Sequence, residues 1–217
     1  MQKTVGAWIL PALAACATGG GSSPGSSAPS LTPTTAAVAS TADTDADTNA
    51  RIARLKRSFD CVDAPGTGAY VCSMKDGIVG SLVRKRIEPV VTSTGTISLR
   101  SVYRDRDWIY HDHVTVRVGG EVLRSEALPA TSPDVMRREA RRREKDREQS
   151  VAEQVTYRGG SDSGIVRAIA QAGTSAVTMQ LAGGPRTYER ALTADEKRLF
   201  AEAYELAQLL RQRAGTR

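Results

Sequence analysis

A long stretch near the start of the chain, residues 17–49, contains almost no side chain large enough to be buried. It is built mainly from Gly, Ser, Pro, Thr and Ala. Such a segment gains too little from burial to offset the entropy lost on ordering it. We therefore expect a disordered tether here. The folded part should lie in residues 50–217, which have the length of one ordinary domain.

The residues before this stretch have the three parts of a secretory signal peptide. Residues 1–15 contain a positive charge at Lys3, an apolar segment over residues 5–13, and small side chains at Ala14 and Ala15. The apolar segment is too short to span a bilayer, because a spanning helix needs about 20 apolar residues. The sequence therefore predicts export from the cytoplasm.

The four residues that end at Cys16 read Leu-Ala-Ala-Cys. They resemble the lipobox of bacterial lipoproteins, in which the cysteine is acylated and becomes the first residue of the mature chain. The resemblance implies a lipid anchor that holds the protein on a membrane without a spanning segment. Ala17 follows, where Asp would retain a Gram-negative lipoprotein at the inner membrane, so the resemblance implies the outer membrane, facing the periplasm. An ordinary secretory signal cleaved near Ala17 is the alternative.

The charge balance limits the partners. The chain carries 30 Lys and Arg against 24 Asp and Glu, a formal net charge of +6. This excess is modest and the two signs are interleaved, so we do not expect binding to nucleic acid. The envelope location leaves an envelope protein, peptidoglycan or lipopolysaccharide as partners besides the membrane itself.

Two of the three cysteines remain once Cys16 is assigned to the lipid. Folding the segment about a two-residue loop at Gly66 and Thr67 sets Cys61 directly opposite Cys72. An even count in an oxidising compartment favours a structural disulfide between them. Unlinked thiols and a redox dithiol are the alternatives, although the spacing is not Cys-x-x-Cys.

The apolar periodicity predicts an α+β fold, with a mainly antiparallel sheet and amphipathic helices packed on one face. Gly119 and Gly120 suit a type I′ hairpin turn between two of the strands. Alternation predicts strands over residues 97–103, 110–118, 121–127, 152–157 and 177–181, with a short partner of the last ending at 188.

Helical spacing and capping residues predict the helices. Ser161 is expected to cap one that Gly173 ends, and Thr193 with Glu196 forms a capping box for the last helix, which should lie across the sheet. Val residues and Gly80 would also suit an extended segment over residues 78–87. The ranges expected to be helical are 48–57, 78–87, 133–150, 161–172 and 194–210.

The helical insertion expected at about 133–150 is strongly charged. Residues 137–148 contain seven basic and four acidic side chains, and a helix that is polar all round is solvent-bridging or only partly formed. One interpretation is a phosphate-binding patch facing the membrane or lipopolysaccharide. Because the acids are interspersed, we prefer a solvated insertion between two strands.

Two histidines are the strongest candidate for a chemical site. His111 and His113 are expected on the same solvent-facing side of a strand, about 6.6 Å apart. A His-x-His pair can bind zinc, and Asp105, Asp107 and Asp112 lie near in sequence. Asp112 should point to the opposite face, and no second His-rich segment occurs. The sequence therefore predicts two polar side chains on a wet face, with no metal ion and no cofactor.

No other pattern indicates catalysis. Ser161 and Ser163 are explained by helix capping, and no Gly-x-Ser-x-Gly motif occurs. Trp108 is expected to be a half-buried anchor at a strand start rather than a ligand platform. The order of elements in the C-terminal half loosely resembles small envelope domains of unassigned function, which brings no functional residues to this chain.

We therefore expect a non-enzymatic envelope binding or accessory module. The alternative is a small metal-dependent periplasmic hydrolase that uses His111 and His113. A carrier of a small ligand, with a concave apolar pocket, is a third hypothesis.

Overall fold

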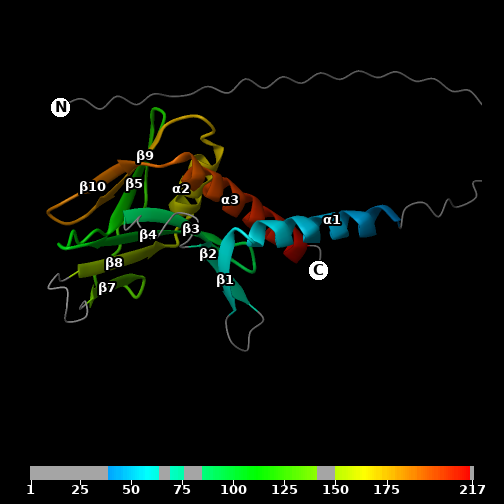
Figure 1. The fold of residues 1–217 in the computed structure, drawn as a ribbon, viewed down its shortest axis with the longest axis horizontal. Helices are drawn as coiled ribbons and strands as arrows, with labels where there is room; N and C mark the ends of the chain where they lie inside the picture. The colour runs from blue at the N-terminus through cyan, green and yellow to red at the C-terminus, as the bar shows by residue number, and fades with distance from the viewer. Residues whose placement is uncertain (1–38, 64–68, 76–84, 141–149, 216–217) are drawn as a thin grey trace, which may run out of the picture. The chain divides into compact units, whose positions relative to one another are not determined.

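The computed structural model describes residues 39–63, 69–75, 85–140 and 150–215 (Figure 1). They form two antiparallel sheets and α-helices within one compact unit, which confirms the α+β class. The signal peptide, Cys16, the tether up to residue 38 and the loop at Gly66 and Thr67 lie outside the described residues. Among the helices described, none is long and apolar enough to span a membrane.

The larger sheet has six strands in the order β1-β2-β3-β4-β8-β7. Odd-numbered residues of its central strands, such as Leu99 and Val155, face the core, while even-numbered residues such as Arg100 face outward. The strands are β1 (Phe59–Asp63), β2 (Tyr70–Met74), β3 (Lys85–Thr92), β4 (Ile97–Asp105), β7 (Val135–Ala140) and β8 (Ser150–Tyr157).

The smaller sheet has four strands in the order β10-β9-β5-β6. Gly119 and Gly120 join β5 to β6 as predicted. The turn is not of the predicted type I′, because that type requires a positive φ at both central residues and only Gly119, with a φ of 59°, has one. Alternation buries Val114 and Val116 completely. The strands are β5 (His113–Val118), β6 (Glu121–Arg124), β9 (Val177–Ala182) and β10 (Tyr188–Ala191).

Three helices are described: α1 (Ala39–Lys56), α2 (Gly160–Gln171) and α3 (Ala194–Gly215). The capping box of α3 is confirmed, since Thr193 N–H donates to Glu196 Oε2 at 2.9 Å and Glu196 N–H donates to Thr193 Oγ1 at 3.2 Å. Figure 1 shows α2 and α3 beside the central strands, with α3 against β3 and α2 against β4. The predicted apolar face of α3 is buried throughout: Leu199, Phe200, Ala203, Leu206, Ala207 and Leu210.

The disulfide between Cys61 and Cys72 is present, and the two residues are opposed in the predicted register. Cys72 is fully buried and belongs to the main apolar core. The bridge therefore links the β1–β2 hairpin covalently at the point where it joins the core.

We expect the double substitution Cys61→Ser with Cys72→Ser to lower the free energy of unfolding by about 2–3 kcal/mol, because the closed loop is short. Urea denaturation of the oxidised protein and the double variant measures this difference. Adding reductant should destabilise the unsubstituted protein and leave the variant unchanged. Equal stability of both proteins under oxidising conditions would contradict the structural role.

The prediction of a helix over residues 78–87 is wrong where it can be tested. Lys85–Thr92 is a strand, β3, which pairs with β4 along most of its length, and residues 76–84 lie outside the described part. Pro89 sits within β3, opposite Leu99. The described pairs of β2 with β3 are confined to Val91 and Thr92, so the lost N–H at Pro89 breaks no ladder with β2.

The charged helical insertion expected at about 133–150 is also corrected. Residues 135–140 form β7, which pairs with β8 from Val135 opposite Val155 to Ala140 opposite Ser150, and residues 141–149 lie outside the described part. Arg137 lies opposite Glu153 in this register. Cross-strand pairing with a buried carboxylate thus outweighs the helical propensity of the Arg and Glu residues.

Helix α1 begins at Ala39, so the prediction of a disordered tether through residue 49 is wrong for residues 39–49. Helix propensity does not explain this, because residues 39–49 contain three Ala and eight Ser, Thr, Asp or Asn residues. The helix there continues the one that is anchored further along the chain. The anchor is supplied by Ile52 and Leu55, which are buried as predicted, and by an ion pair between Arg51 and Glu205 of α3.

Helix α2 also starts differently from the prediction. Gly159 rather than Ser161 is its N-cap, and the N–H of Gly159 donates to Asp162 Oδ2 at 2.6 Å. Gly173, with a φ of 55°, follows the end of the helix as expected.

Candidate functional site

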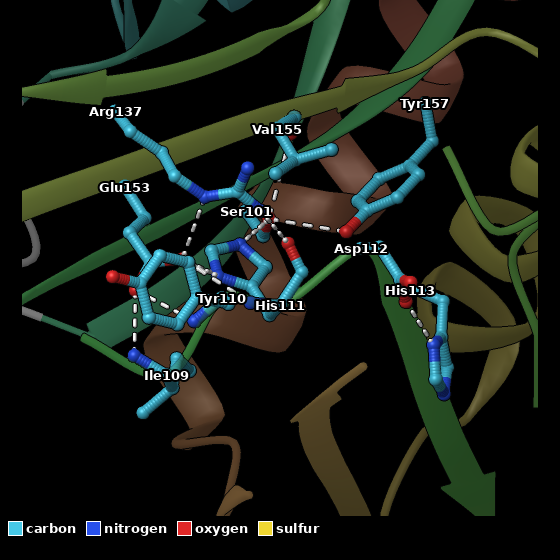
Figure 2. Close-up of polar contacts among 10 residues, drawn as sticks. All are labelled: Ser101, Ile109, Tyr110, His111, Asp112, His113, Arg137, Glu153, Val155 and Tyr157. Carbon is cyan, nitrogen blue, oxygen red and sulfur yellow. Dashed lines mark hydrogen bonds and ion pairs between the residues drawn. The ribbon is translucent and has the colours of Figure 1, made fainter. Parts of the chain in front are cut away.

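Residues 106–112 connect the two sheets, and we call them the anchored loop. Glu153, which is fully buried on the inner face of β8, accepts hydrogen bonds from three consecutive backbone N–H groups of this loop. Its Oε1 accepts from Ile109 at 2.7 Å and Tyr110 at 3.0 Å, and its Oε2 accepts from His111 at 3.1 Å (Figure 2). One carboxylate therefore fixes the path of the loop.

Arg137 of β7 supplies a positive charge beside this carboxylate. Its Nε lies 3.5 Å from Glu153 Oε2, and its Nη2 donates to the backbone carbonyl of His111 at 3.3 Å. The guanidinium carbon also lies 5.4 Å from the centre of the Tyr110 ring. Arg137 thus both compensates the buried charge and supports the exposed aromatic ring.

A series of polar side-chain contacts leads from His111 into the core. Ser101 Oγ lies 2.7 Å from His111 Nε2 and 3.5 Å from the Tyr157 hydroxyl, while His111 Nδ1 lies 3.3 Å from Glu153 Oε2 without the alignment of a hydrogen bond. Burial raises the pKa of Tyr157, so this hydroxyl stays protonated.

The order Ser101, His111, Glu153 is that of a nucleophile, a base and an acid. All three side chains have no exposed surface, however, so no substrate reaches Ser101 in this conformation. The oxygens of Glu153 are already used by the loop N–H groups. The cluster therefore positions the anchored loop and does not form an accessible catalytic centre.

The turn after β9 holds the loop from another side. A Cβ atom added to Gly184 would lie 2.1 Å from the carbonyl oxygen of Ile109, and one added to Gly183 would lie 2.2 Å from Asp112 Oδ1. Gly183 also has a φ of 139°, which L side chains rarely adopt. Close backbone approach at this point requires glycine.

The anchored loop presents two aromatic rings. Tyr110 has a φ of 52°, the one positive φ at a non-glycine residue within the described ranges, and its side chain is 49% exposed. Its ring stacks on that of half-buried Trp108, with centroids 5.7 Å apart and planes at 22°. Such a backbone conformation costs of order 1–3 kcal/mol and persists only where surrounding contacts enforce it. Glu153 and Arg137 provide those contacts.

Folding lowers the pKa of Glu153. Burial on its own raises this pKa, but the contact with His111 and the N–H groups of Ile109 and Tyr110 outweigh it, so the pKa lies below the ordinary value of 4.5. A carboxyl whose pKa falls on folding stabilises the fold above its ordinary pKa, and this contribution is lost as the pH falls through the folded-state pKa.

We therefore expect the free energy of unfolding to decrease below pH 4.5, and the decrease to be shallower in Glu153→Gln. The slope should not vanish, because Glu196, bound by Arg190, also has a lowered pKa. Urea denaturation at a series of pH values measures both slopes. The same acid slope in the two proteins would contradict the assignment to Glu153.

The structure corrects the prediction for the two histidines. His111 does not share a wet strand face with His113: it lies in the anchored loop and is fully buried, whereas His113 begins β5. Asp112, expected to point away, lies with Oδ1 at 2.5 Å from His113 Nδ1. In the described ranges, no three His, Cys, Asp or Glu residues are grouped to hold a metal ion.

Trp108 is half-buried as predicted, but it lies in the loop and not at a strand start, because β5 begins only at His113. Sequence reasoning missed Glu153 and Ser101. A signal for Glu153 exists: it occupies an odd position in β8, and the other odd positions there are apolar, namely Val151, Val155 and Tyr157. An acid on a buried face needs compensating donors, which the loop supplies.

Comparison with known proteins adds no family: no protein-family model, no curated protein and no solved structure matches this chain.

Proposed function

We propose that this protein is a bacterial envelope lipoprotein, acylated at Cys16 and held on the periplasmic side of the outer membrane, which binds an envelope protein without catalysing a reaction. The signal segment and the lipobox-like sequence support the anchor. The anchored loop supports the binding role.

One observation carries the binding proposal. Glu153 fixes three consecutive N–H groups so that Tyr110 keeps an unfavourable backbone conformation and exposes its ring against Trp108. Strained residues held by an over-determined network are concentrated at ligand sites. A loop positioned by a rigid sheet is also a common place for binding residues.

The residue types favour a protein partner. Trp, Tyr and Arg are the side chains most enriched among the residues that dominate protein interfaces. Trp108, Tyr110 and Arg137 lie together, and the exposed ion pair between Arg186 and Asp107, at 2.7 Å, provides a polar edge nearby. The hydrolase hypothesis gains no support, because His111 is enclosed and paired with Ser101.

Site-specific photo-crosslinking in the native host tests this proposal. A photoreactive phenylalanine analogue replaces Tyr110, and in a matched control it replaces Val122, which is 60% exposed on β6. We expect one discrete crosslinked protein from position 110, at least tenfold stronger than from position 122. The same adduct from both positions, or none from position 110, would contradict the proposal.

A further inference from the structure

A polar groove of about 380 Å³ lies on the outer face of the six-stranded sheet. Its lining includes four basic side chains and two acidic ones: Lys75, Arg86, Arg100, Arg104, Asp60 and Glu88. The volume is within the range of small-ligand sites, but the lining is charged. The groove therefore suits a charged ligand rather than an apolar one.

The groove arises from the way in which the β1–β2 hairpin leaves the sheet. β2 pairs with β3 only at Val71 opposite Thr92 and Cys72 opposite Val91. Lys75 is not paired with the first half of β3, although it lines the same groove as Arg86 from that half. Among the described residues, the groove is lined by Lys75 from the hairpin side and by Arg86 and Arg100 from the outer face of β3 and β4.

Glu88 organises the floor of the groove. This side chain is only 1% exposed, and its two oxygens accept from different arginines: Oε2 from Arg86 Nε at 3.0 Å and Oε1 from Arg100 Nε at 2.5 Å. Both contacts use Nε, so they orient the two guanidinium groups around one carboxylate. The contact of Arg100 with Glu88 uses Nε, so its terminal N–H groups can bind a further oxyanion.

The other two basic side chains of the groove, Lys75 and Arg104, are not neutralised by an acidic partner: neither forms an ion pair in the described part of the chain. Arg104 projects from the same face of β4 as Arg100, about 13 Å along the strand by the usual rise per residue. Arg86 lies between them on the neighbouring strand, opposite Val102. The cationic groups are therefore spread over a length that one small monoanion does not cover.

We infer that this groove binds a ligand that carries two or more phosphate groups. Arg matches the geometry of phosphate oxygens through paired N–H donors, and Lys75 adds a mobile point charge at the rim. A phosphorylated lipid headgroup and a soluble polyphosphorylated molecule share this chemistry. The inference uses neither Trp108 nor Cys16, so it stands or fails separately from the proposed function.

Isothermal titration with inorganic pyrophosphate tests the site in the full chain carrying Cys16→Ala, which removes the proposed acylation site from every sample. We expect binding that weakens at least tenfold in Lys75→Ala with Arg104→Ala. The matched control, Arg117→Ala with Arg124→Ala, removes two positive charges from the smaller sheet and should change affinity less than twofold. Circular dichroism verifies that both variants stay folded.

Sedimentation with vesicles that contain cardiolipin, a lipid with two phosphate groups, against phosphatidylcholine vesicles, distinguishes the two sources. Groove-dependent sedimentation that pyrophosphate competes away assigns a lipid headgroup, whereas pyrophosphate binding without sedimentation assigns a soluble ligand, and both support the site. Absence of pyrophosphate binding at millimolar concentration would overturn it. Equal weakening in the control double variant would also overturn it, because attraction would then follow net charge alone.

Discussion

Replacing Glu153 with alanine should lower the free energy of unfolding by about 3–5 kcal/mol, the loss usual when one member of a buried charged network is removed. The substitution leaves the N–H groups of Ile109, Tyr110 and His111 without their acceptor. It also leaves Arg137 without the carboxylate beside it. Unpaired buried donors each carry a desolvation cost, so the effect exceeds that of a lost surface contact.

Urea denaturation followed by circular dichroism measures this loss. In the chain without residues 1–15, which contain Trp8, the fluorescence of Trp108 reports the loop. Glu189→Ala is the control, because Glu189 is an exposed acid whose ion pair with Arg117 should contribute no more than about 1 kcal/mol. At urea concentrations below the unfolding transition, we expect the Trp108 emission of Glu153→Ala to differ from that of the unsubstituted protein. The emission of the control should be the same as that of the unsubstituted protein. A loss below 1 kcal/mol for Glu153→Ala would contradict the anchoring role.

Replacing Gly184 with alanine should destabilise the fold by about 3 kcal/mol, at the upper end of the usual cost of overpacking. The added Cβ would lie 2.1 Å from the backbone carbonyl oxygen of Ile109. A main-chain atom cannot rotate aside as a side chain can, and Ile109 is itself held by Glu153. Relief of the clash therefore requires the turn after β9 and the anchored loop to separate.

Gly120→Ala is the matched control for this substitution. Gly120 lies in another turn, and a Cβ added there meets no atom within 4 Å. Thermal unfolding of both variants measures the difference, with a clearly lower Tm expected only for Gly184→Ala. Equal stability of Gly184→Ala and Gly120→Ala would contradict the close contact between the β9–β10 turn and the anchored loop.

Local patterns predicted the parts of the fold in which neighbouring residues determine the structure. Alternation in β5 and β9 and the capping box at Thr193 each specify an element without knowledge of the rest of the chain. The pairing of Cys61 with Cys72 follows from a short hairpin, which is also local. The two strands, the capping box and the cysteine pairing were predicted correctly because each depends on residues that are close together in the sequence.

The errors lie where distant contacts decide the outcome. β7 was expected to be helical from its Arg and Glu content, but its conformation depends on pairing with β8 and on Arg137 lying opposite Glu153. His111 is buried in the loop against Ser101 of β4 and Glu153 of β8. No spacing within residues 105–113 carries that information, so the wet-face prediction for the histidines was wrong.

The candidate site was only partly accessible from sequence. Trp108 was recognised as half-buried, but its stacking on Tyr110 depends on the positive φ of Tyr110, which the N–H contacts to Glu153 enforce. The outer groove likewise required the register of β3 against β4, which places Arg86 and Arg104 on one face.

The most direct test of the tethered-module account is the intact mass of the protein purified from its native membrane, measured with and without reductant. We predict a chain that begins at Cys16, carries a diacylglyceryl group with or without an amide-linked acyl chain, and gains the mass of two hydrogens on reduction of the Cys61–Cys72 bridge. A mature chain without acyl mass on Cys16, or one that retains residues 1–15, would contradict the account.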